Sequence, residues 1–400
     1  MIDEDLIVKV SAELAVDFVD ARIQRYYNEL VVLDNGVVRE LSCSYVEGVG
    51  VRVVVDGYVG YSSTSSLSRE GVKEAIWRAY KVAKAISSYS TRVDLYNRPT
   101  LKSHARSPYA IDPQDVDFSD KVELLKYMEK VARGVNGVSS IILRLGYELD
   151  QRKYLSSNGD NVEYTRGMIG VSAALIAHVE GIYESLYDQE SSTSGWEFIK
   201  EFSWEEWVLE RAKLAANLAK APHVNPGKYD VVLDNEMVGL MLHEAFGHAT
   251  EGDAVLAGGS VLKGKVGEVV ASELVSIVDD GLVEGGVFVP YDDEGTPKKR
   301  VYTVKNGVLV GFLHSLSTAK PLSEEPTGNA RTMSYRNPVL VRQTNTYMEP
   351  GDWSVDEIIR DTKRGLYVKG IGALGGEVNP LTGSFTFTSG PSYVIEGGEP

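Results

Sequence analysis

Residues 48–63 read GVGVRVVVDGYVGYSS, and they decide the architecture expected for the first part of the chain. Valines alternate with other residues up to Asp56-Gly57, a pair that tolerates the positive φ angles of a two-residue hairpin turn. Upstream, Asn35-Gly36 carries the same signal between two further apolar stretches. The two turns therefore predict consecutive antiparallel strands.

Helical patterns flank these strands. Apolar residues at helical spacing predict a helix over 4–19, and Ser68 is a candidate N-cap for a second helix. The buried stripe of that second helix is expected to be Val72, Ile76, Ala79, Tyr80 and Ala83. Two more helices are predicted at 118–134 and 203–220, and 139–190 between them is predicted to be a meander with a turn at Asn158-Gly159.

The Pro- and Gly-rich stretch APHVNPGK (221–228) predicts a domain boundary near residue 222. We therefore expect an α+β fold in two parts. Residues 1–221 form an N-terminal domain of antiparallel hairpins and amphipathic helices. Residues 222–400 form a mainly antiparallel β domain, in which a strand at 229–234 precedes a helix capped by Asp234 or Asn235. At its end, alternation of Phe385 and Phe387, then Tyr393 and Ile395, predicts strands with one buried face.

Composition narrows the classes of function. The chain has 400 residues, 43% of them hydrophobic, and a formal charge of −16 at pH 7. Nucleic-acid binding requires a cationic surface, so we expect no nucleic-acid partner. The densest basic run, Lys298–Arg300, is predicted to be a solvated turn.

The single cysteine, Cys43, excludes a disulfide within the chain. The N-terminal residues show no signal-peptide pattern, and no apolar run is long enough to cross a bilayer. We therefore expect a cytoplasmic protein with no membrane contact.

The helix after Asp234 carries the stretch MLHEAFGHATEGD (241–253). Zinc hydrolases often carry H-E-x-x-H, which places two imidazoles on one helix face with a carboxylate beside them. Here the second histidine, His248, comes five residues after His243, which corresponds to about 140° of rotation on a straight α-helix. A π-bulge, or a helix end near Gly247, would return His248 to the side of His243.

The residues alone leave alternatives open. The two histidines could simply be packed and hydrogen-bonded near a helix end. The carboxylates of DDEGTP (292–297) are better explained as a solvated turn than as a substrate contact. Arg342 and Asn345 could bind a peptide or be ordinary exposed strand residues, and His314 is predicted to be a hydrogen-bonded core histidine.

Several stretches together resemble the TldD/PmbA family, also called modulators of gyrase. They are LHEAFGHATEGD, DDEGTP, NGVLVGFLHS (306–315), SYRNPVLVRQTNTYMEPGD (334–352) and GGEVNPLTGSFTFTSGPSYVIEGG (375–398). The resemblance covers essentially the whole chain. It implies a zinc metallopeptidase of the TldD-like, H-E-x-x-x-H type. His243 and His248 would then be Zn²⁺ ligands and Glu244 the general base.

The resemblance also implies substrates and partners. Substrates would be unfolded or leader-type peptides, cleaved inside a closed dimer. The partner would be a second copy of the chain or a PmbA-like paralogue.

The third ligand implied by the resemblance is a cysteine beyond the segment SYVIEGG. Cys43 is instead expected to be a small buried residue of a strand. Either the C-terminal domain continues beyond Pro400, or another group completes the site; Glu251, Asp253 and His314 are the candidates. The alternative function is a catalytically silent peptide-binding or partner subunit with an incomplete metal site.

Overall fold

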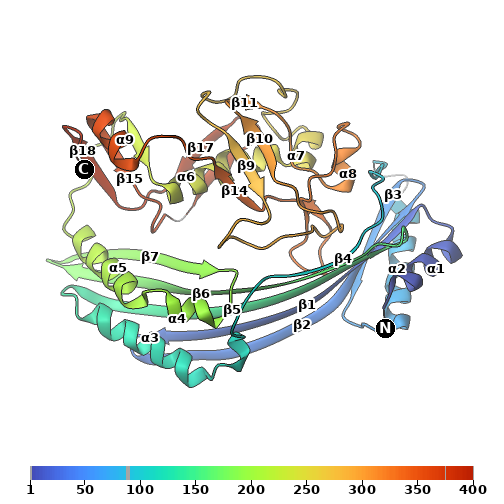
Figure 1. Ribbon diagram of the computed structural model, residues 1–400, viewed down its shortest axis with the longest axis horizontal. Helices are drawn as coiled ribbons and strands as arrows, with labels where there is room; N and C mark the ends of the chain where they lie inside the picture. The colour runs from blue at the N-terminus through green and yellow to red at the C-terminus, as the bar shows by residue number, and fades with distance from the viewer. Residues whose placement is uncertain (1, 87–90, 374, 400) are drawn as a thin grey trace.

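The computed structural model describes residues 2–86, 91–373 and 375–399, and its main element is one long, curled sheet (Figure 1). The strand order is β3-β2-β1-β5-β6, and β4 and β7 both pair with β6. The strands are β1 (Phe18–Asp34), β2 (Val37–Val55), β3 (Tyr58–Thr64), β4 (Lys102–Arg106), β5 (Val138–Ser156), β6 (Asn161–Val179) and β7 (Ile182–Ser192). All neighbours are antiparallel except β4 and β6. The predicted α+β class is confirmed.

The predicted hairpin turns lie where the sequence placed them. Asn35 and Gly36 join β1 to β2 with φ angles of 47° and 81°, and Asp56 and Gly57 join β2 to β3 with 52° and 81°. The turn between β5 and β6 contains Gly159 at a φ of 89°. Asparagine, aspartate and glycine tolerate this left-handed region, which is why these pairs predict hairpins.

Helices cover one face of the sheet in two groups. The helices α1 (Glu4–Leu14) and α2 (Arg69–Ala85) pack near β3, and α3 (Phe118–Arg133), α4 (Trp196–Glu201) and α5 (Trp204–Leu218) pack at the other end. Ser68 caps α2 as predicted, because its side chain accepts a hydrogen bond from the Gly71 N–H at 3.0 Å. The predicted helix over 4–19 is too long. It ends at Leu14 because Ala15 adopts a left-handed conformation and the chain then enters β1.

Residues 231–399 form a second unit that lies inside the curve of the long strands (Figure 1). Its strands are β8 (Val231–Leu233), β9 (Ile277–Asp280), β10 (Val301–Lys305), β11 (Val308–Leu309), β12 (Ala330–Arg331), β13 (Leu340–Val341), β14 (Asn345–Met348), β15 (Arg364–Val368), β16 (Gly376–Asn379), β17 (Ser384–Phe387) and β18 (Ser392–Glu396). Its helices are α6 (Asn235–Met241), α7 (Gly252–Ala257), α8 (Leu316–Ala319) and α9 (Val355–Thr362).

The sheets of this unit are small, and most strand pairs are antiparallel, with β15 and β8 parallel. The single buried face predicted near the C-terminal end is wrong for Phe385, whose side chain is half exposed, whereas Ile395 is fully buried. Phe385 lies on a two-stranded hairpin, β16-β17, which has no further strand beside it to form a core. No helix among the described residues is long and apolar enough to cross a bilayer.

Side-chain alternation divides the long strands into two faces. Odd-numbered residues of β1, β5 and β6, such as Val31, Tyr147 and Ile169, pack in the core beneath α3 and α5. Even-numbered residues, such as Gln24 and Arg152, point away from that core and meet the second unit. The sheet is therefore apolar toward its helices and charged toward the C-terminal unit.

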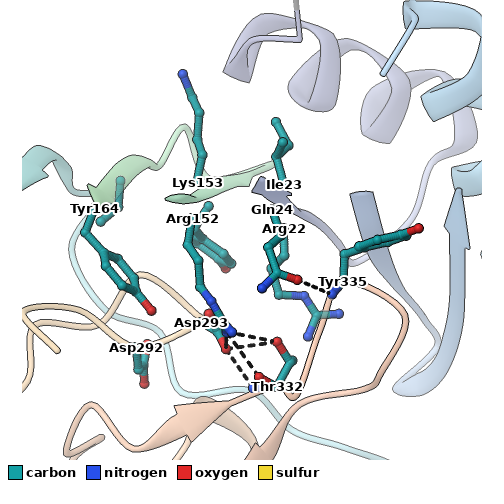
Figure 2. A pocket seen from close by; sticks show the side chains of 12 residues that line it. Arg22, Ile23, Gln24, Arg152, Lys153, Tyr164, Asp292, Asp293, Thr332 and Tyr335 are labelled. Atoms are coloured by element: carbon teal, nitrogen blue, oxygen red, sulfur yellow. Dashed lines mark hydrogen bonds and ion pairs between the residues drawn. The ribbon is translucent and has the colours of Figure 1, made fainter. Parts of the chain in front are cut away.

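Buried ion pairs join the two units. Arg52 of β2 contacts both Asp20 and Glu294, the latter at 2.6 Å. Arg152 of β5 pairs with Asp293 at 2.5 Å (Figure 2). Such pairs are costly to desolvate, so removal of either partner is expected to be strongly destabilising.

The prediction that DDEGTP forms a solvated turn is therefore wrong. Asp292, Asp293 and Glu294 are each at most 5% exposed. The two oxygens of Asp292 accept backbone hydrogen bonds from Glu294, Thr296 and Ala330, while arginines of the sheet neutralise the other two carboxylates. Burial and the neighbouring Glu294 raise the pKa of Asp292.

The basic run Lys298–Arg300 is also only partly a solvated turn. The side chain of Lys298 is fully buried and pairs with Asp279 at 3.0 Å. Lys299, in contrast, is exposed and contacts the exposed Glu325. Charge density in a short run does not by itself indicate exposure, because one buried carboxylate can hold a lysine inside.

Candidate metal centre

Asp234 begins the helix that carries both histidines. Its side chain accepts a hydrogen bond from the Met237 N–H at 2.8 Å, which confirms one of the two predicted caps. The same side chain accepts a second hydrogen bond, from the Gly370 N–H at 2.9 Å, which connects the start of this helix to the loop after β15. The helix start is therefore fixed by one carboxylate from two sides.

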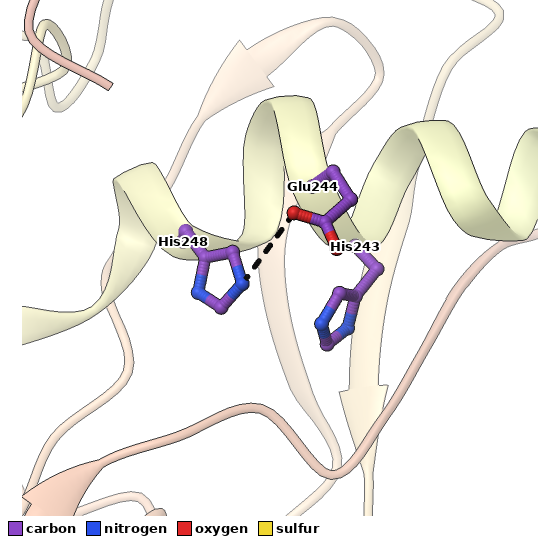
Figure 3. A group of neighbouring side chains, drawn as sticks. All are labelled: His243, Glu244 and His248. Atoms are coloured by element: carbon purple, nitrogen blue, oxygen red, sulfur yellow. Dashed lines mark ion pairs between the residues drawn. The ribbon is translucent and has the colours of Figure 1, made fainter. Parts of the chain in front are cut away.

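After α6 the backbone changes its winding. Residues Leu242–Phe246 form a π-helical turn, η3, and Gly247–Thr250 form a 3₁₀ turn, η4. A π turn accommodates one residue more than an α turn. It brings the rings of His243 and His248 to a centroid distance of 4.9 Å on the same side of the helix (Figure 3). The predicted backbone irregularity is confirmed.

Three side chains converge as a result. Ligand atoms of His243, Glu244 and His248 all lie within 4.8 Å of one another. The closest Glu244 oxygen is 3.9 Å from Nε2 of His248. Two imidazoles are donors that zinc and similar divalent metals bind, and a carboxylate beside them can act as a further donor or as a base.

Gln343 locks the irregular turn. Its Nε2 donates to the backbone oxygen of His243 at 3.0 Å. Its side chain also lies against Gly247, where an added Cβ would be 1.8 Å from the Gln343 Oε1. Gly247 has an ordinary helical φ of −58°, so glycine is required there for close approach. The sequence marked Gly247 but gave no signal for Gln343, which is distant in the chain.

Glu251 orients His248 from behind. Its Oε1 is 3.1 Å from Nδ1 of His248, and its Oε2 accepts from Arg342 at 2.8 Å. The side chain of Glu251 is 5% exposed. Because Nδ1 faces Glu251, Nε2 is left to face the cluster, which is the arrangement that fixes metal-binding histidines.

The two imidazoles differ in their electrostatics. Burial, together with the neighbouring His248, lowers the pKa of His243 and favours its neutral form. The hydrogen bond to Glu251 raises the pKa of His248. A neutral imidazole can donate its lone pair, so His243 is ready to bind a metal near neutral pH.

The candidates for a third ligand have other roles. Glu251 faces His248 Nδ1 and Arg342 rather than the cluster. Asp253 accepts backbone N–H groups of Ala254 and Val341 at 2.8 and 3.0 Å. His314 is fully buried between Thr318 and Glu324, each at 3.1 Å, which confirms the predicted core histidine.

Cys43 is exposed, so its predicted burial is wrong. Cys43 belongs to β2 and lies opposite Glu29 of β1. Among the described residues, this part of β2 pairs with β1 alone, because β3 pairs with β2 only from Val49 onward. Alternation of apolar residues does not reveal whether a second strand pairs with the edge of a sheet.

Asn345 has a structural role. Its side-chain amide forms hydrogen bonds with the backbone of Val287 and with the backbone oxygen of Asp280.

Comparison with known proteins gives the relationship. Profiles of PmbA/TldA metallopeptidases match domain 1 at 19–83, the central domain at 111–221 and the C-terminal domain at 226–400. A metalloprotease of Methanocaldococcus jannaschii is 34% identical over 388 residues, which make up 96% of this chain and 84% of that protein. This chain belongs to the TldD/PmbA family of metallopeptidases.

More distant TldD/PmbA relatives add detail. A zinc metalloprotease TldD homologue of Saccharolobus solfataricus is 27% identical, covering 98% of this chain and 85% of that protein. The solved structure of TldE from Thermococcus kodakarensis is 22% identical, with a TM-score of 0.80 over 99% of this chain and 88% of that one. A modulator of DNA gyrase from Thermotoga maritima reaches a TM-score of 0.82 at 23% identity, with the same coverage. These two structures establish the fold.

Proposed function

We propose that this chain is a zinc-dependent peptidase in which His243 and His248 hold the metal and Glu244 is the general base. The observation that carries the proposal is the π turn, which gathers these three side chains within 4.8 Å. The metalloprotease relatives and the TldD homologue described as a zinc enzyme support zinc as the metal. The two imidazoles are zinc donors, and the carboxylate of Glu244 lies beside them, where a base is needed.

The residues of the chain have separate tasks in this proposal. Zinc, when bound, would polarise the scissile carbonyl and lower the pKa of a water molecule. Glu244 accepts a proton from that water at its carboxylate and delivers it to the leaving amine. Glu251, buried and paired with Arg342, holds the ring of His248, and Gln343 holds the backbone of His243.

We propose unfolded or leader-type peptides as substrates, cleaved in the cytoplasm inside a closed dimer. The partner would be a second copy or a paralogue, and the structural likeness to a TldE chain supports a paired arrangement. An extended peptide can bind through its backbone along a strand, which tolerates many sequences. The formal charge of −16 supports the absence of a nucleic-acid partner.

Zinc content and hydrolysis together test the proposal. Glu244→Gln keeps the size of the side chain, so the purified variant should retain about one zinc per chain and lose hydrolysis of unfolded peptides. His243→Ala should lose the metal itself. Full hydrolysis by Glu244→Gln, free of contaminating proteases, would overturn the role of Glu244.

A second candidate is a catalytically silent peptide-binding or partner subunit. Within residues 2–86, 91–373 and 375–399, the metal cluster contains no cysteine or third histidine, and this observation favours an incomplete site. Wild-type protein that binds peptides but neither holds zinc nor hydrolyses them would support this candidate over the enzyme.

A further inference from the structure

Arg331 of β12 is tied to the metal helix by two successive contacts. Its Nη1 donates to the backbone oxygen of Gln343 at 2.6 Å, and the Gln343 side chain donates to the backbone oxygen of His243 at 3.0 Å. The positive charge of Arg331 also contributes to lowering the pKa of His243 at the metal centre. Arg331 therefore lies beside the metal centre and is linked to it through Gln343.

The positive charge of Arg331 has no counterion in the described part of the chain. Its neighbours Arg152 and Arg166 share the carboxylate of Asp150 at 2.8 and 3.5 Å. Asp293 is committed to Arg152 and to Thr332, as Figure 2 shows. Three guanidinium groups thus face two carboxylates, which leaves one positive charge in excess.

This excess lies within an acidic chain, and the nearby Arg22 also has no hydrogen-bond partner for its guanidinium among the described residues. The chain as a whole carries −16, and Arg331 is only partly exposed. Burial and the like charge of Arg166 lower the pKa of Arg331, so the protein holds this cation in an unfavourable place. A partly exposed arginine that is crowded by like charges and has no carboxylate partner is suited to bind an anion.

We propose that Arg331 binds a carboxylate of the peptide substrate beside the metal centre. A guanidinium recognises a carboxylate through two parallel hydrogen bonds, and Arg331 has only Nη1 engaged by the protein. The carboxylate is either the C-terminus of the peptide or an acidic side chain next to the scissile bond. This inference rests on the proposed peptidase function and specifies its substrate class.

Peptide binding to the inactive Glu244→Gln protein, loaded with zinc, is the test. A fluorescent unfolded peptide is titrated in four forms. Its C-terminus is either free or amidated, and in each case its acidic side chains are either kept or replaced by the corresponding amides. We expect that removing the recognised carboxylate, by one of these two changes, weakens peptide binding about 10- to 100-fold. Loss on amidation identifies the C-terminus as the source, and loss on Asp→Asn or Glu→Gln replacement identifies a side chain.

The second arm uses Arg331→Gln in the same background, with Arg364→Gln on the exposed end of β15 as the matched control. Arg331→Gln should erase the preference for the carboxylate form while zinc content stays unchanged, and Arg364→Gln should keep the preference. Equal affinity of the parent protein for all four peptides would overturn the assignment. If wild-type protein still cleaves those peptides, only the role of Arg331 fails and the proposed peptidase function stands.

Discussion

Oε1 of Glu251 lies 3.1 Å from Nδ1 of His248, and this contact sets the direction of the opposite ring nitrogen. Glu251→Gln keeps a hydrogen-bond acceptor but removes the charge that also binds Arg342. Partners of this kind typically contribute about 10- to 100-fold to metal affinity. We expect zinc affinity, measured by competition with a chelator, to fall by about tenfold. The exposed Glu268→Gln is the control, and an unchanged affinity in Glu251→Gln would refute the orienting role.

The contact between Gly247 and Gln343 predicts coupled mutations. Gly247→Ala places a methyl group 1.8 Å from Gln343 Oε1, so the π turn must shift, at a cost of about 1–3 kcal/mol in the free energy of unfolding. Gln343→Ala removes the clash together with the hydrogen bond to His243. The double variant should therefore be more stable than the sum of the single effects, by about 1 kcal/mol, in urea unfolding. Additive effects would mean that the two residues do not pack as described.

The ion pair between Arg152 and Asp293 predicts a large loss of stability on truncation. Arg152→Met leaves the buried Asp293 without its arginine and leaves Asp150 with only the longer ion pair to Arg166, and such losses are about 3–5 kcal/mol. The exposed pair of Lys299 and Glu325 provides the comparison, because Lys299→Met should cost less than about 1 kcal/mol. Urea unfolding of both variants measures the difference. Similar small losses would show that the junction is more hydrated than the structure indicates.

The carboxylate of Glu197, at the N-terminus of α4, is expected to make the stability of the protein depend on pH. Burial alone would raise its pKa, but backbone N–H groups of Ala110, Ile111 and Gly195 bind the carboxylate and lower the pKa from 4.5 to about 2. The depressed pKa means that this stabilisation is full above pH 4.5 and is lost as the pH falls toward 2.

Glu197→Gln should therefore be about 1 kcal/mol less stable than wild type at pH 6, and the difference should shrink steadily between pH 4.5 and 2. Unfolding curves recorded across this range provide the measurement. A gap that stays constant down to pH 2 would mean that charge contributes nothing to these hydrogen bonds.

The local parts of the structure were readable from the sequence. Turns such as Asn35-Gly36, the cap at Ser68 and the irregular winding around Gly247 depend on neighbouring residues, whose conformational preferences act over a few positions. The family resemblance then implied roles for His243, Glu244 and His248 that await experiment. The domain boundary near residue 222 also stays a prediction.

The remaining features depend on partners far apart in the chain. Asp293 is buried because Arg152 reaches it from β5, and Lys298 because Asp279 lies beside it. Cys43 is exposed where, among the described residues, only β1 pairs with β2. Gln343 contacts the metal helix, and Arg331 contacts Gln343, although both are about 90 or more residues away from His243 in the chain. Residue type predicted none of these, because each outcome depends on which charge or strand the fold brings alongside.

The π turn can also be viewed as an insertion of one residue into an ordinary zinc helix. Removing Ala245 would restore the sequence H-E-x-x-H, and a regular α-helix would then suffice to align the histidines. The same deletion would remove the irregular turn whose backbone oxygen and glycine surface Gln343 contacts. The extra residue of the turn and Gln343 therefore act as one structural unit, in which a long-range side chain supports a local irregularity of the backbone.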